Sequence, residues 1–154
     1  MSLEELYARP AHLIRRAHQI SWAIFLDECA EYNLTPVQYS ALVAIDAYPG
    51  TDATRLSNMI AFDRSTIGSV LDRLEKRELI ERRASGADRR QRLIFLTAQG
   101  AKLLEDCKEA VDRVQNRIVG VLSRAERETF LKLMTRIAQM HNDVTSAPIR
   151  PVDP

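Results

Sequence analysis

The chain has 154 residues, which is enough for one domain and leaves no room for a second independent core. Hydrophobic residues make up 45% of it, which excludes a disordered chain, and no apolar run approaches the roughly 18 residues of a membrane-spanning helix. The 22 basic residues nearly balance the 21 acidic ones, and the resulting net charge of +1 by itself argues against a nucleic-acid-binding protein.

The N-terminal segment has neither the basic start nor the apolar stretch of a signal peptide, so we expect a cytoplasmic protein. Cys29 and Cys107 form no disulfide framework, and neither they nor the three histidines have metal-ligand spacing, so we expect no metal and no cofactor. We find no nucleophile with a base, no paired acids and no glycine-rich phosphate-binding loop, and we therefore expect no enzymatic activity.

Helix-start and helix-stop signals divide the chain into six predicted helices. Thr35-Pro36 offers an N-cap and a proline at the first helical position, Asp63 can cap the helix that follows it, and Ser123 with Glu126 forms a capping box. Asn33 and Pro49-Gly50 are stop signals. The predicted helices cover residues 10–32, 36–48, 52–60, 64–78, 98–121 and 124–145.

Two short β-like runs, residues 79–83 and 92–96, flank a polar loop that contains Gly86, and this pattern predicts a β-hairpin. The sequence therefore predicts a mainly α fold with a small two-stranded β-wing, that is, a winged helix-turn-helix joined to a helical dimerisation region. We assign residues 36–96 to the winged helix-turn-helix, 10–34 and 98–145 to the dimerisation helices, and 146–154 to a flexible tail, either a disordered end or an extended arm.

The two C-terminal predicted helices carry apolar residues every seven positions: Leu104, Val111 and Ile118 in one, Phe130, Ile137 and Val144 in the other. This is the spacing of coiled-coil seams. A pair of helices within one chain would explain it. However, the winged helix has a core of its own, so we expect the long helices to pack against a second copy in a homodimer.

The second helix of the predicted helix-turn-helix carries a set of outward-facing polar residues. Its inward stripe is Ile67, Val70, Leu71 and Leu74, which leaves Arg64, Ser65, Thr66, Ser69 and Arg73 outside. An arginine and short hydroxyls at the start of such a helix suit a reader of the DNA major groove. Gly68 is unusual in a helix interior and indicates either a tight helix crossing or a close approach of the backbone to DNA.

A merely solvated helix face is the alternative, and the distribution of charge argues against it. Residues 55–92 hold ten basic and six acidic residues, a net charge of +4, whereas the rest of the chain has a net charge of −3. The predicted hairpin alone carries five arginines against Asp88: Arg82, Arg83, Arg89, Arg90 and Arg92. Such a patch favours binding to the phosphates of double-stranded DNA, and an arginine at its tip suits a narrow minor groove.

The segments LTPVQYSALVAI and DATRLSNMIAFDRSTIGSVLDRLEKRELIERRASGADRRQRLIFLTAQG resemble the MarR family of bacterial transcription regulators, and the similarity extends over about residues 10 to 145. The resemblance implies a dimer that places two winged helices on one pseudo-palindromic operator. In the family's D-x-R wing pattern, Arg90 would enter the minor groove, while Asp88 would pair with a neighbouring arginine and stiffen the wing.

The resemblance also implies a small-molecule effector, because family members often bind aromatic acids between the dimerisation helices and the DNA-binding lobe. The first predicted helix has two apolar stripes and suits that position. Four of its residues are predicted to form a carboxylate clamp and an aromatic wall: Arg15, Arg16, His18 and Trp22. Tyr39 and Leu42 are expected to lie opposite them. Packing in the core explains Trp22 equally well. The expected function is a repressor released by a small aromatic acid or its thioester.

Two alternatives remain. A redox-sensing regulator would use Cys29, but this residue has no basic neighbour in the sequence to lower its pKa. A winged helix can also serve as a protein-interaction module, although such a module has no need of five arginines in its wing.

Overall fold

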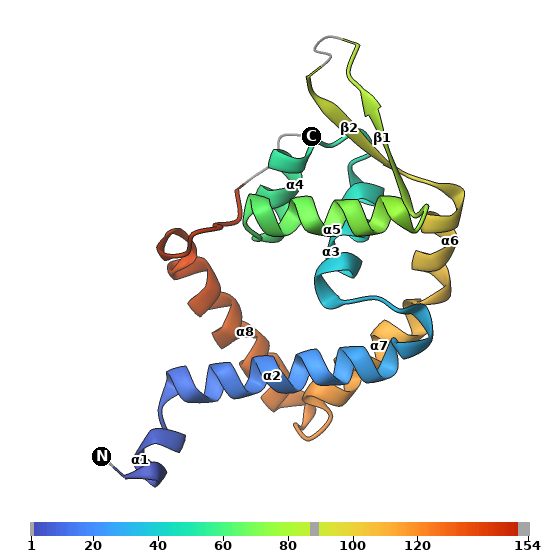
Figure 1. Cartoon of the computed structure of the whole chain (residues 1–154). Coiled ribbons are helices and arrows are strands. Elements are labelled where there is room, and N and C mark those ends of the chain that lie inside the picture. Colours follow the sequence, from blue (N-terminus) through green and yellow to red (C-terminus); the bar gives the residue numbers. More distant parts are fainter. Residues whose placement is uncertain (1, 87–89, 151–154) are drawn as a thin grey trace.

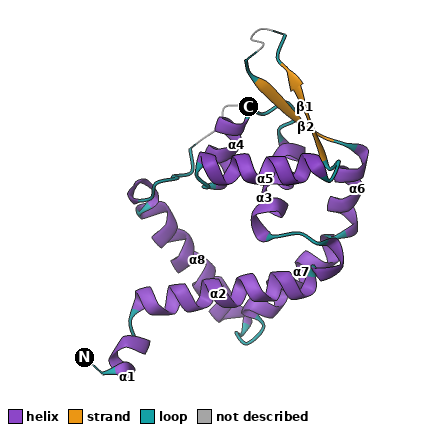
Figure 2. Cartoon of the chain, viewed as in Figure 1, coloured by secondary structure: helices purple, strands orange, loops and turns teal. Residues whose placement is uncertain are grey.

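The computed structural model describes residues 2–86 and 90–150, and it confirms a mainly α fold with a two-stranded wing (Figures 1 and 2). The helices are α1 (Leu3–Tyr7), α2 (Pro10–Glu28), α3 (Pro36–Ala47), α4 (Ala53–Ile60), α5 (Arg64–Lys76), α6 (Ala98–Asp106), α7 (Lys108–Val119) and α8 (Arg124–Met140), with the 3-10 turns η1 (Ala30–Tyr32) and η2 (Asn142–Val144). The strands are β1 (Ile80–Ala84) and β2 (Arg92–Leu96).

Local capping sets the helix starts. The Thr35 hydroxyl accepts from the amide of Gln38, whose side chain accepts from the Thr35 amide in return, and Ser123 and Glu126 form the same reciprocal pair. Asp52, which the sequence analysis placed inside a helix, instead caps α4 by accepting from the amides of Thr54 and Arg55.

Several helices differ from the prediction. The structure adds α1, the predicted helix 10–32 ends at Glu28 and is followed by η1, and the predicted helix 124–145 ends at Met140 and is followed by η2. The predicted helix 98–121 divides at the buried residue Cys107, the C-cap of α6 and N-cap of α7, and its thiol donates to the Leu104 carbonyl at 3.4 Å. α5 ends at Lys76 because Glu78 adopts a left-handed conformation (φ 59°). The amides of Glu78 and Leu79 then bond back to the carbonyls of Glu75 and Leu74, as in a Schellman motif.

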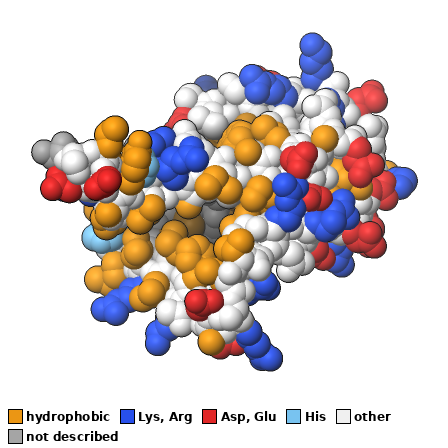
Figure 3. All heavy atoms as spheres, turned by 90° about the horizontal axis from the view of Figure 1, so that it is seen from below, with side chains coloured by type: hydrophobic (Ala, Val, Ile, Leu, Met, Phe, Trp, Pro, Cys, Tyr) orange, Lys and Arg blue, Asp and Glu red, His pale blue; other side chains and the backbone are white. Residues whose placement is uncertain are grey.

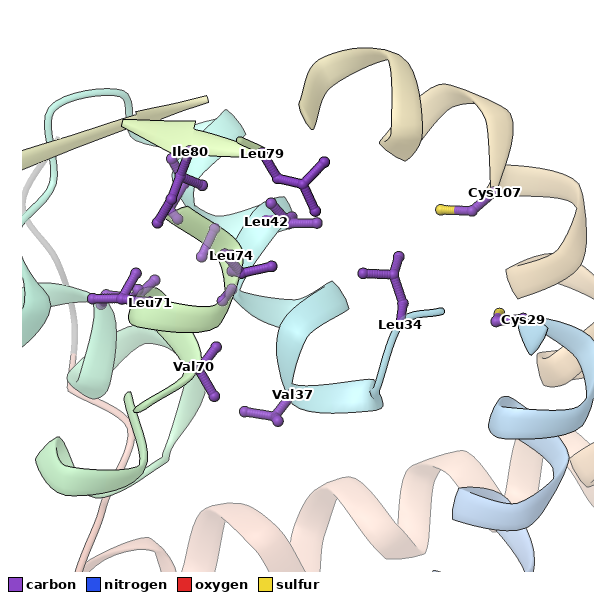
Figure 4. Close-up of a cluster of buried hydrophobic side chains, with 14 of the residues drawn as sticks. Cys29, Leu34, Val37, Leu42, Val70, Leu71, Leu74, Leu79, Ile80 and Cys107 are labelled. Carbon is purple, nitrogen blue, oxygen red and sulfur yellow. The ribbon is translucent and has the colours of Figure 1, made fainter. Parts of the chain in front are cut away.

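The reading lobe, residues 36–96, surrounds a buried apolar core. β1 and β2 pair antiparallel from Ile80 opposite Leu96 to Ala84 opposite Arg92. Figure 4 shows Leu42, Leu71, Leu74 and Ile80 among the side chains that meet there, all at most 2% exposed. The core fixes the inner face of α5 and therefore the direction of its outer face.

We call α2, α6 and α7 the framework: α2 packs along α7, and α6 joins α7 to the reading lobe, where it contacts α3 and β2 (Figure 1). Ion pairs join α2 to α7: Arg113 Nε lies 2.8 Å from a Glu28 oxygen, and Arg117 contacts both Asp27 and Glu28 at 2.6 Å. These arginines hold the pKa of Glu28 below its ordinary value.

α8 leaves the framework and runs towards the reading lobe, and none of its described residues is buried (Figure 1). Residues 146–150, part of the segment predicted to be a flexible tail, contact the rest of the chain: the Arg150 amide donates to the Asn58 carbonyl at 3.0 Å, and the Ile149 amide to Asn142 Oδ1 at 2.9 Å. None of the described helices combines the length and apolarity needed to span a membrane.

Candidate nucleic-acid interface

The N-terminal end of α5 is ordered by Asp63. Its carboxylate accepts from the Thr66 amide at 2.9 Å and from the hydroxyls of Ser65 and Thr66 at 2.5 Å. These bonds hold the pKa of Asp63 well below its usual range, with the Ser65 hydroxyl the largest contributor. Because both hydroxyl protons point to Asp63, Ser65 and Thr66 present acceptor oxygens to an approaching molecule.

The outer face of α5 is open. The stripe predicted to point inward is buried, and Arg64, Ser65, Ser69 and Arg73 are exposed, while Thr66 is half-buried. A Cβ placed on Gly68 would meet no atom within 4 Å in the described part of the chain. A tight helix crossing within the chain therefore does not explain this glycine.

The wing is more tightly paired than the sequence suggested. Arg82, predicted to join a phosphate-binding patch, instead contacts Asp72 at 2.7 Å and also Glu75, both on α5. The Glu75 carboxylate raises the pKa of Arg82, and Arg82 in turn lowers the pKa of Glu75. Arg83 pairs with Glu81 and lies 4.8 Å from the centre of the Phe95 ring. Arg82 and Arg83 thus brace the wing against its own neighbours.

The remaining arginines of the wing lie nearer its tip. Arg90 and Arg92 are exposed, while Asp88 and Arg89 lie outside the described residues. The minor-groove contact of Arg90 and the stiffening role of Asp88 therefore stay predictions.

A hydrogen bond that the sequence analysis missed fixes the wing relative to α4. Gln91 Nε2 donates to Asp52 Oδ2 at 2.8 Å, and the Gly50 amide donates to the Ile94 carbonyl at 2.9 Å. Asp52 therefore both caps α4 and holds the residue that precedes β2, at the loop end of the hairpin. No local pattern could have found the Asp52–Gln91 bond, because its partners are 39 residues apart.

A second candidate site lies between the framework and the reading lobe. This pocket of about 280 Å³ is lined from α2 by His18, Ser21, Trp22 and Phe25, and otherwise by Pro36, Phe62, Val114, Gln115 and Ile118. The rings of His18 and Trp22 are tilted, with their centroids 6.0 Å apart. Aromatic walls with a few polar groups are typical of small-molecule sites.

The structure brings together only two of the six residues predicted to bind an effector, His18 and Trp22. Arg15 and Arg16 both donate to Gln19 Oε1 on the exposed surface of α2 and do not line the pocket. Tyr39 lines a different cavity of about 440 Å³ beneath Ile149, and Leu42 is fully buried in the core.

Ser21 and Gln115 are the polar lining residues that the sequence analysis missed. Ser21 lies three positions after His18, so helical spacing could have found it. Gln115 comes from a distant helix, and no pattern joins it to His18.

Both cysteines are buried, Cys29 at 1% and Cys107 at 0% exposure. Burial raises the pKa of each thiol, which opposes formation of the reactive thiolate. The structure therefore does not favour redox sensing through Cys29.

Comparisons with known proteins agree with this geometry. The family model of the MarR family matches residues 34–91. The chain is 30% identical over 126 residues to the HTH-type transcriptional repressor NicR of Pseudomonas putida, and the match covers 82% of this chain and 80% of NicR.

Two solved structures share the fold over most of this chain. The repressor CouR bound to a 23-mer DNA duplex has a TM-score of 0.82 and 32% identity, and the match covers 90% of this chain and 98% of CouR. BpsR of Bordetella bronchiseptica has a TM-score of 0.81 and 29% identity, with coverages of 86% and 94%. The capped and exposed helix α5, which we call the reader helix, the wing and these relatives together establish that the chain belongs to the MarR family.

Proposed function

We propose that this protein is a cytoplasmic, homodimeric transcription repressor that binds a pseudo-palindromic DNA operator and is released by a small aromatic acid or its thioester. The observation that carries the proposal is the open N-terminal face of α5, with Arg64, Ser65 and Ser69 exposed beside the wing. No enzymatic activity is needed for this role, and we propose none.

The geometry of α5 favours reading of the major groove. The helix is anchored by its buried stripe, so its exposed end is free to enter a groove. Arg64 supplies the donors that recognise guanine, and Ser65 and Thr66 supply acceptors that suit the amino groups of cytosine and adenine. Arg73 adds positive charge along the same face.

Exposed apolar surface supports the homodimer. Leu133, Ile137 and Met140 of α8 are 47–74% exposed, and hydrophobic side chains gather around a hollow on the face seen from below (Figure 3). Exposed apolar patches of this kind mark protein interfaces. A second copy would cover them by symmetry and place two reader helices on one face.

The pocket between framework and lobe supports a small aromatic effector. Trp22, Phe25 and Phe62 supply flat apolar walls, and His18 and Gln115 supply polar contacts for a carboxylate or hydroxyl group. The Ser21 hydroxyl donates to the His18 carbonyl at 2.9 Å and therefore presents an acceptor oxygen. CouR has been solved with p-coumaroyl-CoA, and BpsR is described as regulated by 6-hydroxynicotinic acid. An effector in this pocket would press α2 and Phe62 apart and thereby shift the turn that precedes α5.

The test uses a duplex selected from a random pool by the wild-type protein. We expect Arg64→Ala to weaken binding by about 1 to 3 kcal/mol and to relax the preference for guanine at one position of each half-site. We expect p-coumaroyl-CoA or 6-hydroxynicotinic acid to release wild-type protein from the duplex, and Trp22→Ala to respond less.

Arg15→Ala is the matched control, because it removes one exposed arginine that lies outside both the pocket and the reading lobe. It should bind and respond like the wild type. Wild-type affinity in Arg64→Ala would contradict the major-groove role. Full release of Trp22→Ala at wild-type effector concentrations, or no release of the wild type by either compound, would contradict the proposed effector.

A further inference from the structure

One arginine connects the reader helix to the framework. Arg77, the C-cap of α5, donates from Nη1 to the Asn33 carbonyl at 2.6 Å and from Nη2 to the Tyr32 carbonyl at 3.0 Å. We call these three residues the latch. The planar guanidinium fork is suited to two adjacent acceptors, which a lysine ammonium group cannot span with the same fixed geometry.

The turn that Arg77 grips is itself held by the framework. The Tyr32 hydroxyl donates to the Asp106 carbonyl at the end of α6, at 2.8 Å. Just before the turn, Glu28 of α2 is paired with Arg113 and Arg117 of α7. Arg77 therefore anchors α5 to a braced structure and not to a loose loop.

The residues that follow Arg77 are fixed from a second side. The Glu78 carbonyl accepts from the Thr97 hydroxyl at 2.6 Å, and the Leu79 carbonyl accepts from the Thr97 amide at 3.1 Å. Gly100 packs so closely that a Cβ there would lie 2.0 Å from the Leu79 oxygen. The C-terminal end of α5 is thus the end that is joined to the framework, and its N-terminal end, held within the reading lobe by Ile67, is the one exposed for DNA.

The length of α5 makes the position of its N-terminal end sensitive to small rotations about Arg77. Thirteen residues at about 1.5 Å each give α5 a length of about 20 Å. Because the buried stripe of α5 holds it in the core of the reading lobe, the lobe and α5 would turn together. A rotation of about 10° about Arg77 would then move the N-terminal end of α5 by about 3.5 Å, which is about the rise of one base pair. In a dimer, small changes at the latch would change which half-sites the two reader helices reach together.

We propose that Arg77 is a positioning residue that sets the angle of α5 on the framework and thereby the half-site spacing that the dimer accepts. The inference rests on the proposed binding of operator DNA by a homodimer and is independent of the effector. It also gives Tyr32 and Asn33 a role, since their carbonyls fix the guanidinium.

The test measures spacing selectivity. A duplex selected by the wild-type protein is compared with duplexes whose half-sites are one base pair closer or farther apart. We expect the wild type to bind the altered duplexes about tenfold or more weakly, because one reader helix then misses its site. For Arg77→Gln we expect the altered duplexes to bind at most about threefold more weakly than the selected duplex. The lysine of Arg77→Lys reaches one carbonyl at a time, so its spacing penalty should lie between those of the wild type and Arg77→Gln.

Lys76→Gln is the matched control, because it removes one exposed charge from the same helix end and leaves the latch intact. It should keep the wild-type spacing penalty even where its overall affinity falls. An unchanged penalty in both Arg77 variants, or an equal relaxation in Lys76→Gln, would overturn the proposal. If Arg77→Gln does not fold, the test rests on Arg77→Lys. A spacing penalty in Arg77→Lys equal to that of the wild type would then refute the role of the latch. If the wild type selects no duplex, the proposed operator binding itself has failed.

Discussion

Gly68 lies inside α5, where glycine is less favourable than alanine by about 1 kcal/mol. Its backbone is helical, and a Cβ there would touch no atom in the described part of the chain, so neither conformation nor packing within the chain requires glycine. A tight helix crossing is absent from the described part of the chain, and a close approach of DNA is the explanation that we propose to test.

We therefore expect Gly68→Ala to raise the melting temperature by about 2 to 4 °C, because alanine orders the helix at a lower entropic cost. The same variant should bind a selected duplex more weakly, since the added methyl group would separate helix and DNA. Thermal unfolding and duplex titration check the two effects. Duplex binding as tight as that of the wild type, in a Gly68→Ala variant that is stabilised, would contradict a close approach of DNA. Ser69→Ala is the comparison variant, because it shows how much affinity is lost when a neighbouring hydroxyl is removed.

The arginines of the wing differ in their contacts in a way that the sequence analysis did not predict. Charge counting treated Arg82 and Arg90 alike, since both lie in the same basic hairpin. In the structure, Arg82 faces Asp72 and Glu75 across the helix–strand junction, seven to ten residues away in sequence. Composition cannot show that an arginine of a basic segment is held by carboxylates of the same chain.

At the scale of elements, α6 depends on one glycine for its position. Gly100 is buried in the first turn of α6 and packs on the Leu79 backbone, where an added Cβ would lie 2.0 Å from the carbonyl oxygen and 3.0 Å from the carbonyl carbon. Because both contacts are with backbone, no side-chain rotation relieves them.

Gly100→Ala should therefore destabilise the protein by about 2 kcal/mol or more, as overpacking of a close contact does. Gln99→Ala changes the exposed neighbouring position and should stay within about 0.5 kcal/mol of the wild type. Urea unfolding of both variants measures the difference. Equal stability of the two would show that α6 moves away from Leu79 at little cost.

The sequence predicted the helices from residue 10 onward, but it missed α1, and it placed several helix ends wrongly. Caps such as Thr35 and Ser123 act within three residues, so the sequence displays them directly. The division at Cys107 and the left-handed Glu78 have no such local signal, because other residue types are more usual at both positions.

On the scale of the whole molecule, α8 has no partner within the described chain that buries any of its residues. Its heptad positions include Leu133 at 52% exposure and Ile137 at 47%. Burial of one such side chain contributes about 1.5 to 3 kcal/mol, and a two-fold axis would count it twice.

Ile137→Glu should then raise the dimer dissociation constant by about two to four powers of ten and weaken duplex binding with it. Gln139→Glu adds the same charge to α8 without removing an apolar group, and it should remain dimeric. Analytical ultracentrifugation over a range of protein concentrations makes the comparison. A monomeric wild type, or a fully dimeric Ile137→Glu, would contradict an interface on this face of α8.

The sequence by itself determined the order of helices and wing, the inner and outer faces of α5, and the separation of charge between the reading lobe and the rest of the chain. These features depend on caps and on periods of a few residues, which local physics specifies. Only the tertiary structure decided that Arg82 braces the wing, that His18 and Trp22 share a pocket with Gln115 while Leu42 does not, and that Arg77 reaches Tyr32 and Asn33. Such contacts join side chains that are far apart in sequence, and their partners are selected by the packing of whole elements around the core.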